Sequence, residues 1–209
     1  DNSLTIFRDI PGIILACPSN GADAVRMFRT SVKESYKNGR IVVFIEPIAL
    51  YMVKDLHKSK DNRWCFKYPD IGDELELGEF VTYGRGSALI IISYGNGLYH
   101  SLKAQPEIEK KIKNKIKIID LCWLSDISIK NILKEIGDSN KILIVDECRS
   151  TGSHGEGLMA LLYEKSKNNI SIKLHAAENS FIPLGEAATS TLPDYKTIIQ
   201  HSIKLYNNG

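Results

Sequence analysis

The sequence lacks the short motifs by which many enzymes bind metals, nucleotides or acyl groups. None of its five histidines forms an HxxxH pair and none of its four cysteines a CxxC pair, so no metal site is visible. A P-loop, a GxGxxG turn and a GxSxG elbow are also missing. These absences predict a chain without a self-contained active site.

An excess of charge and a long apolar run are missing as well. The 27 basic and 25 acidic residues leave a net charge of +2, which argues against nucleic acid as a partner. No apolar run approaches the roughly 18 residues of a membrane span, and no signal peptide is visible. The scattered cysteines predict reduced thiols and a cytoplasmic protein.

What the sequence does contain is a regular alternation of strands and helices. Short branched apolar runs predict buried strands, and runs of three- and four-residue periodicity between them predict helices. The expected strands are 13–17, 41–45, 88–94, 115–120, 142–146 and 170–174. The polar stretch 53–82 interrupts the pattern and is expected to separate two units. This order predicts an α/β protein with a mainly parallel sheet covered on both faces.

The stretch 141–158 carries the densest set of charges at the end of a strand. A polar turn with Glu147 and Arg149 follows the strand, His154 lies among glycines, and a helix is expected from Leu158. The carboxyl edge of a parallel sheet is where ligands and partners bind. Two interpretations remain open here, a docking surface formed by these three residues and a plain strand-to-helix turn in which Arg149 pairs with the acids.

Taken together, the motifs resemble one enzyme family. The segments IPGIILACPSNGADA, VVFIEPIALY, GEFVTYGRGSALIIISYGNG, IKIIDLCWLSDIS and ILIVDECRSTGSHGEG occur in this order. The series resembles the beta subunit of thiamine-diphosphate-dependent 2-oxoacid dehydrogenases, or the matching half of single-chain forms, over residues 9–206. The resemblance implies a three-layer sandwich like the transketolase C-terminal domain, preceded by an incomplete βαβ piece of a pyrimidine-binding domain.

The same resemblance implies a division of the chain and of the chemistry. Residues 1–55 would be the last part of the pyrimidine-binding domain, 56–75 a linker, and 76–209 the transketolase-type domain. Because the chain opens on Asp1 and the family's reactive residues lie upstream of any match, we expect a C-terminal fragment with no catalytic residue. Thiamine diphosphate and Mg²⁺ belong to the parent enzyme, and no cofactor is expected on this chain.

The parent enzyme would decarboxylate pyruvate or a branched-chain 2-oxoacid and acylate a lipoyl group. This chain would then serve subunit assembly, with an alpha subunit or N-terminal half, a second copy and the dihydrolipoyl acyltransferase core as partners. Glu147, Arg149 and His154 are the candidate docking residues, and a potassium ion held by backbone carbonyls near Ser35, Asn38 and Arg40 is a further possibility.

Two alternatives carry different functions. One is a free-standing flavodoxin-like module that binds a nucleotide or a protein at the 147–157 loop. The other is the C-terminal region of transketolase or deoxyxylulose-phosphate synthase. Those enzymes place a phosphate-clamping arginine after the strand equivalent to 41–45, where this chain has Glu46 and Pro47.

Overall fold

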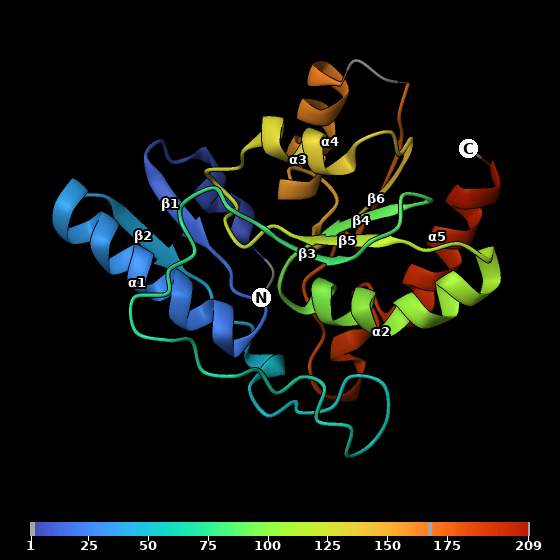
Figure 1. Cartoon of the computed structure of the whole chain (residues 1–209), viewed down its shortest axis with the longest axis horizontal. Helices are drawn as coiled ribbons and strands as arrows, with labels where there is room; N and C mark the ends of the chain where they lie inside the picture. Colours follow the sequence, from blue (N-terminus) through green and yellow to red (C-terminus); the bar gives the residue numbers. More distant parts are fainter. Residues whose placement is uncertain (1–2, 167–168, 209) are drawn as a thin grey trace.

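The chain folds into a small two-stranded unit and a larger five-stranded unit joined by a long connecting segment (Figure 1). This arrangement comes from a computed structural model, which describes residues 3–166 and 169–208. The strands are β1 (Ile13–Ala16), β2 (Ile41–Phe44), β3 (Val81–Gly84), β4 (Ile90–Ser93), β5 (Lys117–Asp120), β6 (Lys141–Arg149) and β7 (Ser171–Ala177). The helices are α1 (Gly21–Asn38), α2 (Gly95–Ile112), α3 (Ile129–Ile136), α4 (His154–Lys165) and α5 (Tyr195–Asn208), with short 3₁₀ turns at Leu4–Asp9, Ile48–Leu50 and Gly185–Thr189.

The larger sheet has the strand order β3-β5-β4-β6-β7, parallel except for β3. Successive residues of β4 face opposite layers: Ile91 packs with α2 and α5, whereas Ile90 and Ile92 pack with α3 and α4. Helices therefore cover both faces (Figure 1), and the predicted three-layer α/β fold is confirmed.

In the small unit, α1 joins the parallel strands β1 and β2. The Asn20 side chain caps the start of α1 by accepting hydrogen bonds from the backbone N–H groups of Ala22 and Asp23, and Gly39 ends the helix at φ 62°. The apolar stripe of the helix faces outward, however, with Phe28 57% and Tyr36 89% exposed.

Two predictions about the elements were wrong, and one strand was missed. The second strand is not buried, since Ile41 at its start is 66% exposed and the rest of β2 is only half-buried. The antiparallel edge strand β3 was missed because its residues, Val-Thr-Tyr-Gly, form no branched apolar run and end in a glycine. The helix expected from Leu158 begins at His154, which moves two glycines out of the predicted loop and into the helix.

The two units meet where the loop after β5 runs alongside β1. The Cys17 N–H donates to the Cys122 carbonyl at 2.8 Å, and the Leu124 N–H donates to the Leu15 carbonyl at 2.8 Å. Ala16 and Trp123 form an antiparallel bridge between these bonds. Backbone pairing and a shared apolar cluster thus join the small unit to the large one.

The connecting segment between Tyr51 and Phe80 contains no helix or strand within the described part of the chain. Four backbone N–H groups, including those of Leu56 and Arg63, donate to the Asp61 carboxylate. Trp64 packs against Tyr99 of α2 with ring centroids 5.0 Å apart. The division at 55 and 75 remains a prediction. In the described residues, no helix combines the length and apolar character needed to cross a membrane.

Candidate functional site

The candidate site lies at the carboxyl ends of β4 and β6, which are neighbours in the large sheet. After β4 the chain turns into α2 on one face, and after β6 it turns into α4 on the other. In open α/β sheets, adjacent strands whose connections diverge in this way form the crevice that binds ligands. The predicted residue Glu147 lies at this crevice.

The Glu147 carboxylate is turned inward onto the start of α2. Its Oε1 accepts the backbone N–H of Asn96 at 2.7 Å, and its Oε2 accepts the Asn96 side-chain amide at 2.7 Å. Burial raises the pKa of Glu147, against the opposing effect of the Asn96 hydrogen bonds. An acid of the protein therefore occupies the position at the helix start that would attract an anionic ligand.

The adjacent Asp146 does the same for α4. Its Oδ2 accepts the Gly155 N–H at 2.6 Å, and its Oδ1 accepts the Tyr94 hydroxyl at 2.5 Å and the Cys148 N–H at 2.8 Å. A Cβ on Gly155 would lie 2.9 Å from the Asp146 carboxylate and 2.7 Å from Leu174. Both helix starts at this edge are thus capped by carboxylates of the chain itself.

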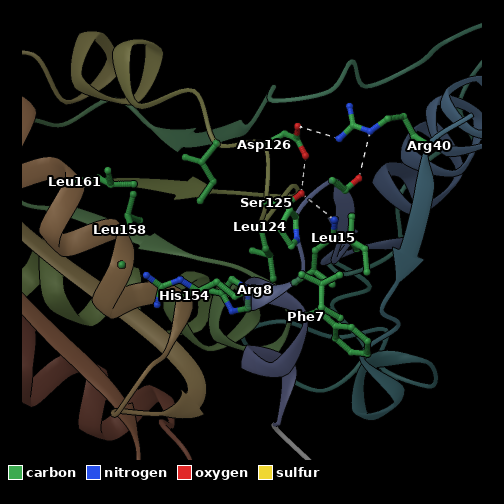
Figure 2. Close-up of a pocket in the computed structure, with 16 residues that line it drawn as sticks. Phe7, Arg8, Leu15, Arg40, Leu124, Ser125, Asp126, His154, Leu158 and Leu161 are labelled. Atoms are coloured by element: carbon green, nitrogen blue, oxygen red, sulfur yellow. Dashed lines mark hydrogen bonds and ion pairs between the residues drawn. The ribbon is translucent and has the colours of Figure 1, made fainter. Parts of the chain in front are cut away.

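His154 lies at the first position of α4 and is 4% exposed. Neither of its ring nitrogens has a hydrogen-bond partner among the described residues. The ring lies edge-on to Tyr94 with centroids 6.5 Å apart. Burial lowers the pKa of His154, as does the nearby Arg8, against the effect of Asp146. The imidazole is therefore neutral near pH 7 and borders a cavity (Figure 2).

Arg149 points to a different part of the surface. Its guanidinium donates to Ser3 Oγ at 2.6 Å and to the Ser180 carbonyl at 3.4 Å, and lies 5.3 Å from the centre of the Phe181 ring. The three predicted docking residues therefore do not share one exposed patch. Glu147 faces α2, His154 faces a cavity, and Arg149 faces the loop that follows β7. Their role in docking stays a prediction.

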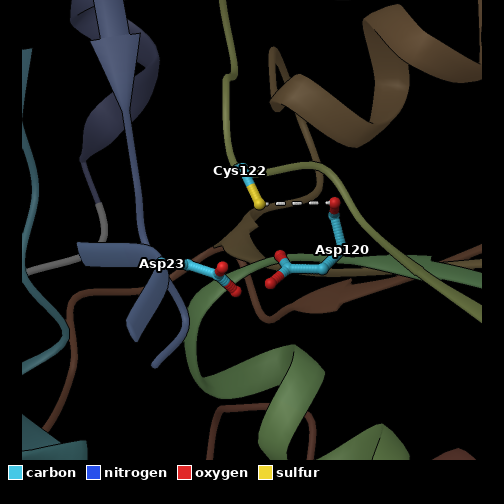
Figure 3. A group of neighbouring side chains, drawn as sticks. All are labelled: Asp23, Asp120 and Cys122. Atoms are coloured by element: carbon cyan, nitrogen blue, oxygen red, sulfur yellow. Dashed lines mark hydrogen bonds between the residues drawn. The ribbon is translucent and has the colours of Figure 1, made fainter. Parts of the chain in front are cut away.

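A second group of acids lies between the two units (Figure 3). Ligand atoms of Asp23, Asp120 and Cys122 lie within 4.8 Å of one another, and all three residues are buried. Ser19 donates to Asp120 at 2.8 Å, and burial raises the pKa of Asp120 to about 8, with the charge of Asp23 adding to the effect. At neutral pH Asp120 therefore carries a proton, which a bound cation would have to displace.

Sequence reasoning missed this group because its members come from α1, the end of β5 and the loop after it. The only local signal was an acid at the end of the apolar run 115–120. Cys122 also has a positive φ of 57°, which no motif indicates. The 2.9 Å ion pair between Arg26 and Asp23 supplies the compensating charge.

Another cavity, of about 510 Å³, lies at the carboxyl ends of β1 and β2. Glu46 lies on its wall and accepts a hydrogen bond from the Tyr51 hydroxyl. At the opposite end of β2, Arg40 donates to the Gly12 carbonyl at 3.3 Å and lies 3.6 Å from Asp126. The potassium site predicted near Ser35, Asn38 and Arg40 remains a prediction.

The diphosphate of a thiamine cofactor does not fit the two helix starts at the carboxyl edge. A diphosphate needs free backbone N–H groups or a metal ion. Here the N–H of Asn96 and that of Gly155 already donate to Glu147 and Asp146. Binding at either helix start would place phosphate against a carboxylate.

Comparisons with known proteins agree on one family. A family model described as "Transketolase, C-terminal domain" matches residues 78–192. The chain is similar to the pyruvate dehydrogenase E1 component subunit beta of Staphylococcus epidermidis, with 24% identity over 97% of this chain and 58% of that protein. The Bacillus subtilis subunit is 23% identical over 93% of the chain and 56% of its own length. The chain thus spans less than three fifths of these relatives.

Solved structures show the same fold. The structure described as "Split gene transketolase, inactive beta4 tetramer" superposes with a TM-score of 0.73 at 17% identity, covering 99% of this chain and 61% of that one. A transketolase from Pichia stipitis gives a TM-score of 0.62 at 14% identity, covering 99% of this chain and 27% of that one. Because the family match spans more than half of the sequence, the chain belongs to the transketolase C-terminal domain family.

Proposed function

We propose that this chain is part of the beta half of the decarboxylating component of a 2-oxoacid dehydrogenase of pyruvate or branched-chain type. The parent enzyme would decarboxylate the 2-oxoacid on thiamine diphosphate and acylate a lipoyl group. The observation that carries the proposal is the similarity to E1 beta subunits, which runs through both structural units over 93–97% of the chain.

Glu46 supports this assignment over a transketolase or a deoxyxylulose-phosphate synthase. Its carboxylate lies on the wall of the cavity at the end of β2. An enzyme that binds a phosphorylated sugar there would need a cationic side chain to bind the phosphate. The nucleotide-binding alternative is disfavoured by Glu147, which fills the crevice at the start of α2.

The role of the chain itself in this proposal is assembly, with no catalytic residue of its own. Phe28, Val32, Tyr36 and Ile41 are 57%, 42%, 89% and 66% exposed and belong to one small unit. These side chains remain exposed although the small unit already packs against the large one, so they are available to another protein. We assign the exposed apolar face to contacts with an alpha subunit, an N-terminal half or a second copy. The surface around Arg149 would contact the acyltransferase core, and the complex would be cytoplasmic.

The test is association and activity measured together. The chain alone, with pyruvate, thiamine diphosphate and Mg²⁺, should release no carbon dioxide at an enzymatic rate. Release at such a rate should require the rest of the enzyme. Tyr36→Asp should weaken association at least about tenfold because it puts a charge on the apolar face. Lys37→Asp, at the neighbouring exposed position, is the control. Decarboxylation by the chain alone would refute the proposal.

A further inference from the structure

A cavity of about 330 Å³ lies between the small unit and the first turns of α4 (Figure 2). One wall is formed by the N-terminal turn and β1, another by the loop after β5, and the third by the first turns of α4. Its apolar lining consists mainly of Phe7, Ile10, Leu15, Leu124, Leu158 and Leu161. This volume suits a compact organic molecule.

The polar groups of the cavity leave one cation without an acidic partner. Arg40 and Asp126 on the rim lie 3.6 Å apart and neutralise each other. Arg8 instead donates to the carbonyls of Gly152 and Ser153 at 3.1 and 2.9 Å, and no carboxylate within 4 Å pairs with it in the described residues. Asp146 acts electrostatically on His154 but does not line the cavity, so the side chains of the cavity wall carry a net positive charge.

The buried imidazole of His154 gives the second, independent indication of a ligand. Its side chain is 4% exposed, lines the cavity, and has both ring nitrogens without partners in the described part of the chain. Leaving a buried imidazole without hydrogen bonds costs free energy, so we expect its N–H to donate to an acceptor supplied by a ligand. A carboxylate between Arg8 and His154 would accept from both.

Gly157 shows how closely Arg8 is fitted to this position. A Cβ at residue 157 would lie 2.2 Å from Arg8 Nη2, so only glycine lets the guanidinium lie against α4. We propose that the cavity is a binding site for a small carboxylic acid with a compact apolar body. The carboxylate lies between Arg8 and His154 and the apolar body lies against the leucines of β1, the loop and α4.

The test uses the full chain with benzoate, its neutral analogue benzamide and inorganic phosphate, followed by NMR of the His154 ring. Benzoate should shift this signal saturably, with a Kd on the order of 1 mM or tighter, and benzamide should bind at least about tenfold more weakly. Arg8→Gln should weaken benzoate about tenfold, whereas Arg63→Gln, an exposed arginine on the connecting segment, should change nothing.

If Arg8→Gln fails to fold, Gly157→Ala displaces the same guanidinium while placing a good helix former in α4, and should weaken benzoate to a similar degree. Equal binding of benzoate and benzamide would overturn the role of the charge. Phosphate that binds as tightly as benzoate would refute the role of the apolar lining in binding. No saturable shift at all would overturn the proposal, leaving water as the partner of His154.

Discussion

Replacing Glu147 tests whether an internal acid closes the crevice at the carboxyl edge. Glu147→Ala removes two hydrogen bonds of 2.7 Å and exposes the Asn96 N–H at the start of α2. Hydrogen bonds to a charged group contribute about 1.5–3 kcal/mol each and are not additive, so the expected loss is about 2–3 kcal/mol. For a chain of this size that lowers the melting temperature by about 4–12 °C.

Glu147→Gln should cost roughly half as much. Both carboxylate oxygens accept hydrogen bonds from Asn96, whereas a glutamine offers one acceptor and turns its NH₂ group toward a donor. The control is Glu164→Ala, because Glu164 is exposed and, among the described residues, its carboxylate pairs with the adjacent Lys165, so its removal should change stability by about 0.5 kcal/mol or less.

The decisive measurement is the effect of phosphate on thermal unfolding. If the Glu147 carboxylate occupies an anion-binding position, its removal leaves that position empty. Phosphate at ten times its Kd should then raise the free energy of unfolding of Glu147→Ala by about 1.4 kcal/mol, and should not stabilise the wild-type chain. Phosphate that stabilises the wild-type chain equally would show that the crevice is already open. An alanine variant that melts with the wild type would show that the two hydrogen bonds contribute nothing.

Two further predictions concern buried groups. Because burial raises the pKa of Asp120 from 3.8 to about 8, the folded protein keeps a proton that the unfolded chain releases, and stability should fall as the pH rises between these values. Asp120→Asn should flatten this slope and raise the melting temperature at pH 8, and parallel slopes would contradict the reasoning. Gly155→Ala should cost about 1–3 kcal/mol in chemical denaturation, because its Cβ would lie 2.7 Å from Leu174 and 3.0 Å from Ile144. Gly157→Ala should cost far less, because only the movable end of Arg8 is in its way, and an equal loss in both variants would refute this.

The elements of the large unit were predictable because their signals are local. Runs such as 142–146 are apolar on both faces, as a central parallel strand requires, and they became β6 and its neighbours. The ends of α1 also have local signals, because Asn20 and Gly39 are residue types that favour helix caps.

The remaining features depend on tertiary contacts that leave no local pattern. Gly155 and Gly157 are poor helix formers and so predicted a loop, yet both lie in α4. They are glycines because Asp146 and Arg8 approach these positions too closely for a side chain. The proximity of Asp23 and Asp120 depends on how two units pack. The outward direction of the apolar stripe of α1 could not be predicted, because periodicity shows which residues share a face but not what covers that face.

The contrast between the two surfaces of the chain supports the assembly role more strongly than any single motif. At the carboxyl edge, Glu147 and Asp146 satisfy the helix starts that a cofactor phosphate would need, so that edge is complete as it stands. On the small unit, Phe28 and Tyr36 remain exposed although burying them would be favourable by about 1.5–3 kcal/mol each. Covering the apolar face with another protein would therefore contribute more free energy than binding an anion at the satisfied helix starts, as the proposed assembly role requires. The proposed association should therefore involve the exposed face of α1.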